Sequence, residues 1–185
     1  MRAGRTVKTA AVWAGMLIVS LSVSCGILMI VFAVGERSFA VPVHTVNGGV
    51  AIRNDNYGEG YFGAKRRGGR KHSGLDIACE IGDSVIAAKS GWAVCEENVR
   101  GYGKLIIIYH PDGAESRYAH LDRFCIDKSQ WVFQGEVIGA AGKSGNAGHA
   151  GIDPHLHFEI RRGGRAVDPA RYIRRKGLEA AETEK

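Results

Sequence analysis

Past its N-terminal segment, the chain consists of short apolar runs that glycine-containing turns interrupt, and this pattern limits what it can fold into. The runs at residues 85–88, 92–95 and 105–109 are rich in strand-forming residues, and turn sequences at 101–103 and 111–113 border them. No long segment with the 3.6-residue period of a helix occurs there. Several short strands at close spacing are typical of an all-β domain, so we expect a small antiparallel β-sheet or rolled-sheet domain.

The stretch DPHLHFEIRR at residues 153–162 shows the strand pattern in its strictest form. Polar and apolar residues alternate in the order His155, Leu156, His157, Phe158, Glu159 and Ile160. Because successive side chains of a strand point to opposite faces, the apolar residues are expected in the core and the two histidines on the other face. Such a pair belongs either to a solvated strand face or to a metal or acid–base site, and a metal site requires ligands from elsewhere.

The N-terminal part of the chain carries a different signal. Residues 10–34 form an uncharged run of 25 residues, and three cations precede it, Arg2, Arg5 and Lys8. As a helix, this run is long enough to cross a bilayer core of about 30 Å, whereas the apolar region of a cleaved signal peptide has about 7 to 15 residues. We therefore expect a cytoplasmic segment at residues 1–9 and one transmembrane helix at 10–34. The alternatives are cleavage after residue 40 and, less favoured, a lipid-modified Cys25.

The rest of the chain is expected to lie outside the cytoplasm, in the periplasm or on the cell-wall side, by the positive-inside bias. Its composition suggests a short stalk at residues 35–51, one domain with a single core at 52–173, and a polar tail at 174–185. Residues 41–185 hold 21 Lys and Arg against 18 Asp and Glu. A nucleic-acid-binding domain is normally more basic than this, so we expect no nucleic acid among the partners.

The three cysteines of the exported part are Cys79, Cys95 and Cys125, and they lack the C-x-x-C spacing of a zinc ribbon. Since their number is odd, at most one disulfide can form among them, and the sequence does not select the pair. Cys79 lies three residues after Asp76, so on a predicted strand the two side chains point to opposite faces. Cys79 is therefore expected to face the core rather than a metal.

A second motif, His72-Ser73-Gly74-Leu75-Asp76, places a carboxylate near a histidine. Its surroundings favour a loop that enters a strand, and Gly74 permits the tight backbone that would bring His72 and Asp76 together. With one histidine of the alternating strand, they provide two imidazoles and one carboxylate, which suits Zn²⁺ with its fourth position left to water. The other histidine of that strand and His120 would then be unliganded imidazoles, able to transfer protons and stabilise an oxyanion.

These motifs, in this order, resemble the lysostaphin-type zinc metalloendopeptidases, which cut the cross-links of peptidoglycan. The resemblance spans about residues 60–173 and is carried by His72-x-x-x-Asp76, Tyr118-Ala119-His120-Leu121, His155-Leu156-His157-Phe158-Glu159 and the closing Val167-Asp168-Pro169. It implies one Zn²⁺ per chain, bound by His72, Asp76 and His157. It also implies that His120 and His155 are the catalytic imidazoles, in a groove between loops of a small antiparallel β-sheet domain.

Two segments depart from the family pattern. The loop at residues 146–153 is longer than the family's usual connection to the strand that carries His155-Leu156-His157. Residues 60–66 resemble a vertebrate leukocyte chemotaxin module that keeps the metal without acting as a peptidase. The basic run at residues 65–71 either attracts anionic wall material to the groove or forms a solvated loop. Three tyrosines are candidates to line the groove, namely Tyr57, Tyr61 and Tyr102.

The resemblance therefore implies a zinc metalloendopeptidase of the cytoplasmic membrane that hydrolyses peptide cross-links of bacterial peptidoglycan, with stem and cross-bridge peptides as its partners. The alternative is a non-catalytic wall-binding regulator of another cell-wall hydrolase. All five expected ligand and catalytic positions are filled, which favours the enzyme. The sequence does not distinguish a cross-link to a diamino acid from a glycine-containing bridge.

Overall fold

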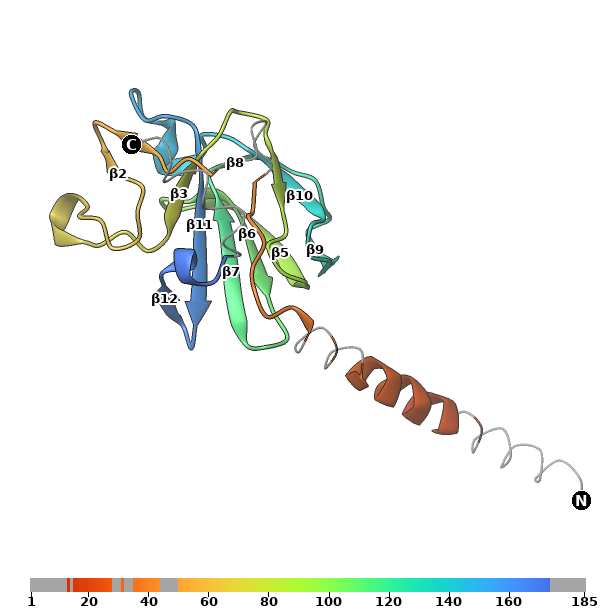
Figure 1. Ribbon diagram of the computed structural model, residues 1–185. Helices are drawn as coiled ribbons and strands as arrows, with labels where there is room; N and C mark the ends of the chain where they lie inside the picture. Colours follow the sequence, from red (N-terminus) through yellow and green to blue (C-terminus); the bar gives the residue numbers. More distant parts are fainter. Residues whose placement is uncertain (1–12, 14, 28–30, 32–34, 44–49, 174–185) are drawn as a thin grey trace, which may run out of the picture. The chain divides into compact units, whose positions relative to one another are not determined.

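The computed structural model describes residues 13, 15–27, 31, 35–43 and 50–173 (Figure 1). The chain divides into two compact units, Met1–Arg37 and Ser38–Lys185. In the first unit residues 15–27 are helical. No helix among the described residues is long and apolar enough to cross a membrane. Parts of the transmembrane helix expected at 10–34, the expected cytoplasmic segment at 1–9 and the polar tail at 174–185 lie outside the described residues.

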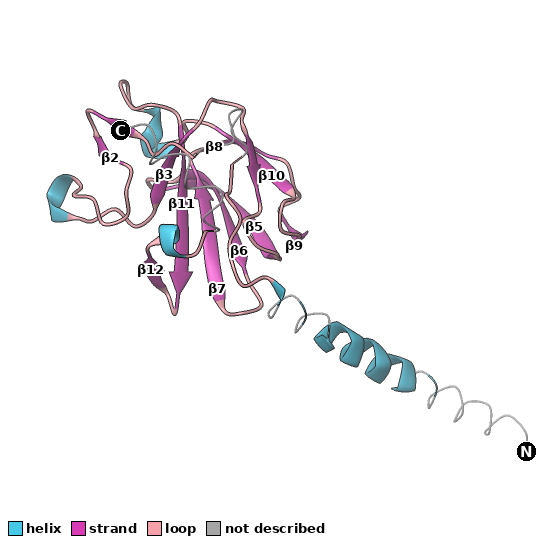
Figure 2. Cartoon of the chain, viewed as in Figure 1, coloured by secondary structure: helices cyan, strands magenta, loops and turns pink. Residues whose placement is uncertain are grey.

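The second unit is built from short antiparallel strands and three single-turn 3₁₀ helices (Figure 2). The all-β prediction is thus confirmed for the described part of this unit. The strands are β1 Asn54–Asp55, β2 Gly58–Glu59, β3 Leu75–Ala78, β4 Ser84–Ile86, β5 Gly91–Val99, β6 Gly103–Tyr109, β7 Ala114–Ala119, β8 Leu121–Phe124, β9 Ser129–Val132, β10 Val137–Ala141, β11 His155–Arg162 and β12 Arg165–Val167. The 3₁₀ helices are η1 Arg67–Gly69, η2 Gly145–Gly148 and η3 Pro169–Arg171.

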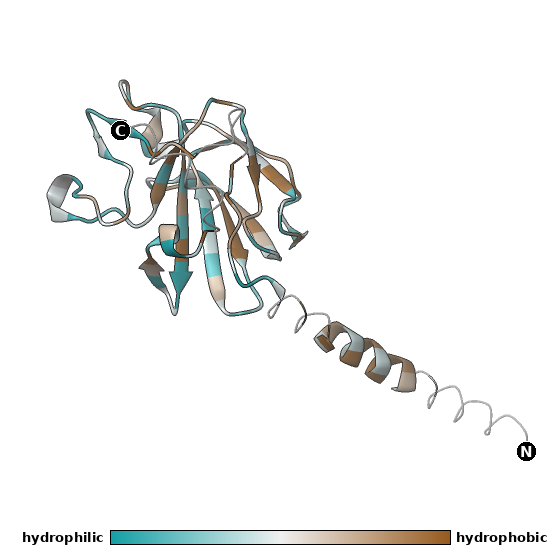
Figure 3. Ribbon diagram, in the orientation of Figure 1, coloured by the Kyte–Doolittle hydropathy of each residue, from teal (hydrophilic) through white to brown (hydrophobic). Residues whose placement is uncertain are grey.

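Two sheets enclose one hydrophobic core. The larger has seven strands in the order β12-β11-β7-β6-β5-β9, with β3 paired to β11, and the smaller has the order β4-β10-β8. Side chains from both sheets belong to the same buried cluster, for example Ile106 and Phe158 from the larger sheet and Val85 and Ile138 from the smaller. Apolar residues concentrate in these strands, and polar residues are frequent in the loops (Figure 3). The small sheet therefore covers one face of the large one.

The strand β11 has the alternation that its sequence predicts. Leu156, Phe158 and Ile160 are fully buried in the core. His155, His157 and Glu159 point to the other face of the sheet, but they are buried as well. Since no residue from 155 to 160 is exposed, the alternative of a solvated strand face is wrong, and loops must cover these three side chains.

The domain begins earlier than its sequence suggests. Residues 38–43 fall in the range that composition indicated as a stalk, yet the side chains of Phe39 and Val43 lie in the core. The backbone N–H of Phe39 donates to the carbonyl oxygen of Tyr172 at 3.0 Å, and that of Ala40 donates to Ala88 at 2.7 Å. The edge of the Phe39 ring meets the ring of His110, with 5.2 Å between their centres. Cleavage after residue 40 would remove Phe39 from this core.

Replacing Phe39 by alanine should therefore destabilise the domain. A buried Phe→Ala change typically costs about 3 to 5 kcal/mol, because it removes apolar contacts and leaves a cavity. Phe39 is 1% exposed, whereas Phe133 is 53% exposed, so Phe133→Ala is the matched control with a small expected effect. Urea unfolding followed by tryptophan fluorescence measures both free energies of unfolding. Equal losses for the two variants would contradict the packing described for residues 38–43.

Candidate metal centre and groove

The pairing of β3 with β11 brings two of the expected ligands together. In this antiparallel register His157 stands directly opposite Asp76, and Phe158 stands opposite Leu75. His72 lies in the loop that leads into β3. Gly74 follows it and lies so close to β11 that a Cβ atom there would come within 2.3 Å of the carbonyl oxygen of Phe158. Only glycine fits, which explains how this loop reaches β11 and places His72 beside the other two residues.

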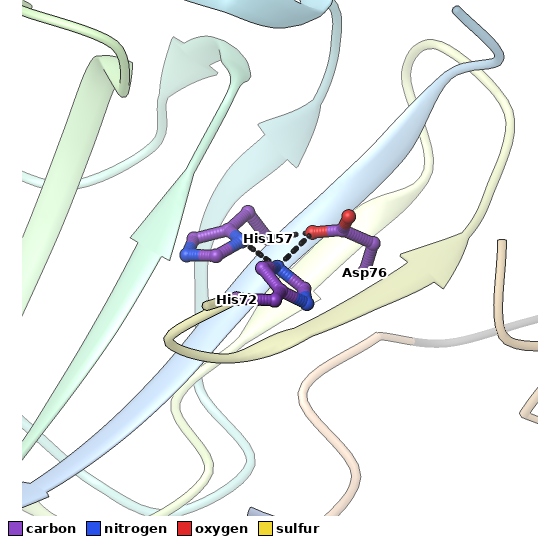
Figure 4. Close-up of side chains that lie close together, drawn as sticks. All are labelled: His72, Asp76 and His157. Carbon is purple, nitrogen blue, oxygen red and sulfur yellow. Dashed lines mark hydrogen bonds and ion pairs between the residues drawn. The ribbon is translucent and has the colours of Figure 1, made fainter. Parts of the chain in front are cut away.

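Three side-chain atoms converge at this point (Figure 4). His72 Nε2 lies 3.0 Å from His157 Nδ1 and 3.0 Å from Asp76 Oδ1, and His157 Nδ1 lies 2.8 Å from Asp76 Oδ1. All three residues are buried. The structure thus brings together the three residues that the resemblance implied as zinc ligands.

The hydrogen bonds behind the two imidazoles determine which nitrogen of each faces this point. His72 Nδ1 lies 2.8 Å from the carbonyl oxygen of Tyr61, which can only accept, so His72 carries its hydrogen there. His157 Nε2 lies 3.0 Å from Glu159 Oε1. Burial would raise the pKa of Glu159, but the hydrogen bond and charge of His157, together with hydrogen bonds from Ser73 and Tyr102, outweigh this effect and lower the pKa to about 2, so Glu159 is an ionised acceptor. In the neutral form of each ring, the nitrogen that faces Asp76 therefore carries a lone pair.

Two lone pairs and a carboxylate oxygen at this distance repel one another unless a proton or a cation lies between them. Burial lowers the pKa of His157, but hydrogen bonds with Asp76 and Glu159 reverse this and raise it to about 9. Burial likewise acts to raise the pKa of Asp76, yet its hydrogen bonds with His157 and His72 hold it well below its usual value. A place that favours positive charge so strongly, with two nitrogen ligands and one oxygen ligand, fits Zn²⁺.

Two of these three residues, His157 and Asp76, have a charged hydrogen-bond partner on the side away from this point. Glu159 is fully buried, and besides His157 it accepts hydrogen bonds from Ser73, from the Tyr102 hydroxyl at 2.8 Å and from Arg161 at 2.9 Å. Metal-binding histidines commonly have such a carboxylate partner, which sets the ring orientation. The alternation of β11 placed Glu159 on the face of His157, so the sequence contained the signal for this contact, although we did not derive it there.

The outer oxygen of Asp76 is held by two arginines. Arg53 donates to Asp76 Oδ2 at 2.9 Å, and Arg66 donates to the same atom at 3.0 Å. Sequence reasoning missed Arg53, which lies 23 residues before Asp76 in no recognisable motif. It also described the run at residues 65–71 only as a solvated loop or an anion-attracting one. Arg66 instead has a defined structural contact, because it orients Asp76 so that Oδ1 faces the two histidines.

His120 and His155 lie next to the three convergent residues, with 4.9 Å between their ring centres. His120 Nδ1 lies 2.9 Å from the carbonyl oxygen of Ser144, and His155 Nδ1 lies 2.7 Å from that of Asp153. Nδ1 of each ring therefore carries the hydrogen, and Nε2 is the basic nitrogen. Burial lowers the pKa of His120 to about 3 and also lowers that of His155, so both rings are neutral at pH 7.

The backbone of His120 is unusual, with a φ of 63° in the left-handed region. Such a conformation costs a residue with a side chain about 1 to 3 kcal/mol and persists where the surroundings enforce it. Here the N–H of His120 donates to the carbonyl oxygen of Tyr102 at 2.9 Å. This bend at the end of β7 directs the imidazole toward His155 and His157.

These residues line a groove of about 710 Å³. Its lining also includes Tyr57, Arg66 and Lys71, as well as Arg100, Tyr102 and the long loop with Asn146 and His149. The Tyr57 hydroxyl donates to the carbonyl oxygen of Ala150 at 2.8 Å, which joins the β1–β2 turn to the long loop. Tyr57 and Tyr102 thus line the groove as the sequence suggested. Tyr61 does not line it, but its carbonyl oxygen holds His72.

His110 and Cys79 are not among the residues that line the groove. His110 is buried between Ser90 and Ser116, at 2.9 Å from each, as expected of a structural histidine, and His44 lies outside the described residues. All four cysteines are free thiols. Cys79 packs against the core, and burial raises its pKa to about 12, so it is not suited to bind a metal as a thiolate.

Comparisons with known proteins agree with this geometry. Residues 70–169, more than half of the chain, match Peptidase family M23. Murein hydrolase activator NlpD of Escherichia coli (strain K12) is 42% identical over 113 residues, which make up 60% of this chain and 28% of that protein. DD-carboxypeptidase/endopeptidase Mpg of Neisseria meningitidis serogroup B is 38% identical over 100 residues, 54% of this chain and 22% of that protein.

Among solved structures, a zinc containing peptidase from Vibrio cholerae shares 32% identity with a TM-score of 0.57, covering 72% of this chain and 40% of that one. The chain thus spans only about a quarter of the length of the two curated relatives. The match to the family model confirms the lysostaphin-type resemblance inferred from the motifs. Convergent ligands, fold and sequence similarity together show that the chain belongs to Peptidase family M23.

Proposed function

We propose that this protein is a zinc metalloendopeptidase that hydrolyses peptide cross-links of bacterial peptidoglycan. The observation that carries the proposal is a complete site, in which the convergent atoms of His72, Asp76 and His157 lie beside the two neutral imidazoles of His120 and His155. The similarity to Mpg, which is named a peptidase, and to a zinc containing peptidase supports it.

In this mechanism His72 Nε2, Asp76 Oδ1 and His157 Nδ1 would hold Zn²⁺, which when bound would supply a water of lowered pKa and polarise the scissile carbonyl. His120 and His155 each offer a basic Nε2, because Nδ1 of each donates to a backbone carbonyl. A neutral imidazole beside the attacking water accepts its proton, and the imidazolium that results donates that proton to the leaving amine. Before it gives up this proton, the Nε2–H of the imidazolium stabilises the developing oxyanion. The two histidines share these roles.

Substitutions should separate the metal ligands from the catalytic histidines. Asp76→Ala or His157→Ala removes a ligand atom, so both zinc content and hydrolysis should fall. His120→Ala leaves all three ligand atoms in place, so zinc should stay near one per chain while hydrolysis falls about 10²- to 10⁴-fold, the usual contribution of a general acid–base group. Metal analysis and muropeptide release should be measured on the same preparations.

Two results would contradict these assignments. Loss of zinc from His120→Ala, equal to the loss from Asp76→Ala, would show that His120 is a ligand. Full activity of a zinc-loaded His120→Ala variant would show that this histidine is structural. His110→Ala, in a buried histidine that does not line the groove, serves as a control for the general effect of removing a buried imidazole.

Glu159 should determine the affinity for zinc without touching it. Glu159→Leu removes the acceptor that fixes the His157 ring, and loss of such a partner typically weakens metal binding about 10- to 100-fold. Glu159→Gln keeps an acceptor oxygen and should restore most of this affinity. Competition with a zinc-chelating dye measures the dissociation constant, and Glu115→Leu, on the neighbouring strand β7, is the control. Unchanged zinc affinity in a folded Glu159→Leu variant would rule out this role.

A second candidate function, activation of another cell-wall hydrolase, is favoured by the 42% identity to a protein named a murein hydrolase activator. The two candidates differ in what the purified chain does alone. A peptidase releases muropeptides from cross-linked wall material, and a chelator stops the release. An activator releases none by itself, but accelerates a separate hydrolase even when the catalytic histidines are replaced. The filled ligand and histidine positions favour the first.

For its location, we propose the bacterial envelope, with residues 10–34 as a membrane anchor and the peptidase domain outside the cytoplasm. The 25 uncharged residues of this run and the cations before it support the anchor. Relatives named as lipoproteins are consistent with an envelope location.

On this basis the full chain should fractionate with membranes, because an uncleaved apolar run of this length stays in the bilayer. Protease added from the periplasmic side should digest the domain, while a cytoplasmic marker protein remains intact. Fractionation, immunoblotting and N-terminal sequencing measure these outcomes. A soluble domain with a new N-terminus near Val41 would instead identify residues 10–34 as a removed signal.

A further inference from the structure

Positive charge is concentrated in the wall of the groove. Five cationic side chains line it, and we refer to them together as the cationic wall: Arg53, Arg66, Arg70, Lys71 and Arg100. Among the described residues that line the groove, the only carboxylate is that of Asp76. The side chains that line the groove therefore carry four more positive than negative charges, and Asp55, which is not among them, pairs with Arg53. The charge of residues 41–185 as a whole is nearly balanced, so this excess is local.

The cationic wall comes from three separate segments of the chain. Arg53 precedes β1, the residues from 66 to 71 lie around η1, and Arg100 lies in the turn between β5 and β6. Like charges repel one another, so a fold gathers them from distant segments only at a cost in stability. An anion bound between them would relieve that repulsion.

Part of the cationic wall is already engaged and part is available. Arg53 and Arg66 donate to Asp76, but the Nε of Arg53 is buried and has no hydrogen-bond partner among the described residues. A buried donor without a partner is unfavourable, and it is unusual in a folded protein. Lys71 and Arg100 are exposed, and neither side chain forms an ion pair or hydrogen bond within the described part of the chain. These two cations can meet a ligand without breaking an existing contact.

We infer that the groove takes peptides with a free carboxylate close to the scissile bond and disfavours uncharged glycine bridges. This inference rests on the proposed peptidase function and names its substrate class. Lys71 and Arg100 line the same cavity as His72, Asp76 and His157, so a peptide bound in this cavity can contact both cations. A substrate carboxylate there forms charge-assisted hydrogen bonds with these cations. A glycine bridge leaves them unpaired.

The concave position of the charge argues for a small peptide ligand rather than a long anionic polymer. A polymer attracted by charge alone would meet cations spread over a convex surface. Here the cations surround the same cavity as the three metal-binding residues and the two neutral histidines. A ligand that reaches them also reaches the catalytic groups.

The test uses two synthetic cross-linked peptides that differ in one group. One has a free carboxylate on the residue next to the scissile bond, and the other has a carboxamide there. With the full-length, zinc-loaded chain in detergent, kcat/KM should be about 10- to 100-fold higher for the carboxylate, which is the range for hydrogen bonds to charged groups. A glycine-bridged peptide should resemble the carboxamide. Equal kcat/KM for the matched pair, or a preference for the carboxamide, would overturn the inference.

Variants of the cationic wall locate the effect. Lys71→Gln and Arg100→Gln should each raise KM for the carboxylate peptide about three- to fivefold, as expected for solvent-exposed pairs, while kcat stays near its original value. Neither change should alter KM for the carboxamide peptide. Arg165→Gln, in an exposed residue of β12 that does not line the groove, is the matched control. Added salt should raise KM only for the carboxylate peptide. Equal effects on both peptides would count against the inference.

The inference and the proposed function can fail separately. If the zinc-loaded chain cleaves neither peptide, the peptidase proposal fails. Calorimetric binding of the same two peptides then still decides the preference of the groove. Tighter binding of the carboxylate peptide, lost in Lys71→Gln and Arg100→Gln but kept in Arg165→Gln, supports the inference. Equal affinity for the two peptides overturns it.

Discussion

The pairing of β3 with β11 is the constraint on which the rest of the site depends. It sets His157 opposite Asp76 and needs the close approach of Gly74 to the backbone of Phe158. A shift of one residue in this register would turn the histidines of β11 into the core and its apolar residues out. The same alternation that buries Phe158 therefore directs His157 at the metal centre, and the stability of the core and the geometry of the site have one cause.

Charged side chains surround the paired residues His157 and Asp76. Glu159 holds His157, and Arg53 and Arg66 hold Asp76, whereas His72 is held by the carbonyl oxygen of Tyr61. His120 and His155 are held instead by neutral carbonyl oxygens, and burial keeps both rings uncharged. The difference matches the separate tasks proposed for these residues, because a ligand benefits from a fixed charge nearby whereas an acid–base group must change its charge.

Local patterns in the sequence were sufficient for the strands and for the central histidines. Period-two alternation predicted β11 with its core face, and the turn sequence at residues 111–113 marked the end of the run that forms β6. Contacts between distant segments could not be predicted in this way. Arg53 is one of many arginines, and only the folded chain shows which of them meets Asp76. Phe39 follows an apolar run, so the sequence does not distinguish it as a core residue of the domain. Its burial depends on contacts with Tyr172 and His110, which are distant in sequence.

The hydrogen bonds that Arg53 and Arg66 donate to Asp76 also affect which metal ions could bind at this candidate centre. With Oδ2 occupied by Arg53 and Arg66, Asp76 can offer one oxygen and cannot clamp an ion with both. Ca²⁺ and Mg²⁺ are bound mainly through several oxygen ligands, so they find a poor match here, although both are common outside cells. Two imidazole nitrogens and a single oxygen favour borderline transition metals instead. Arg53 and Arg66, which do not belong to the proposed ligands, would thus reduce binding of Ca²⁺ and Mg²⁺ at this centre.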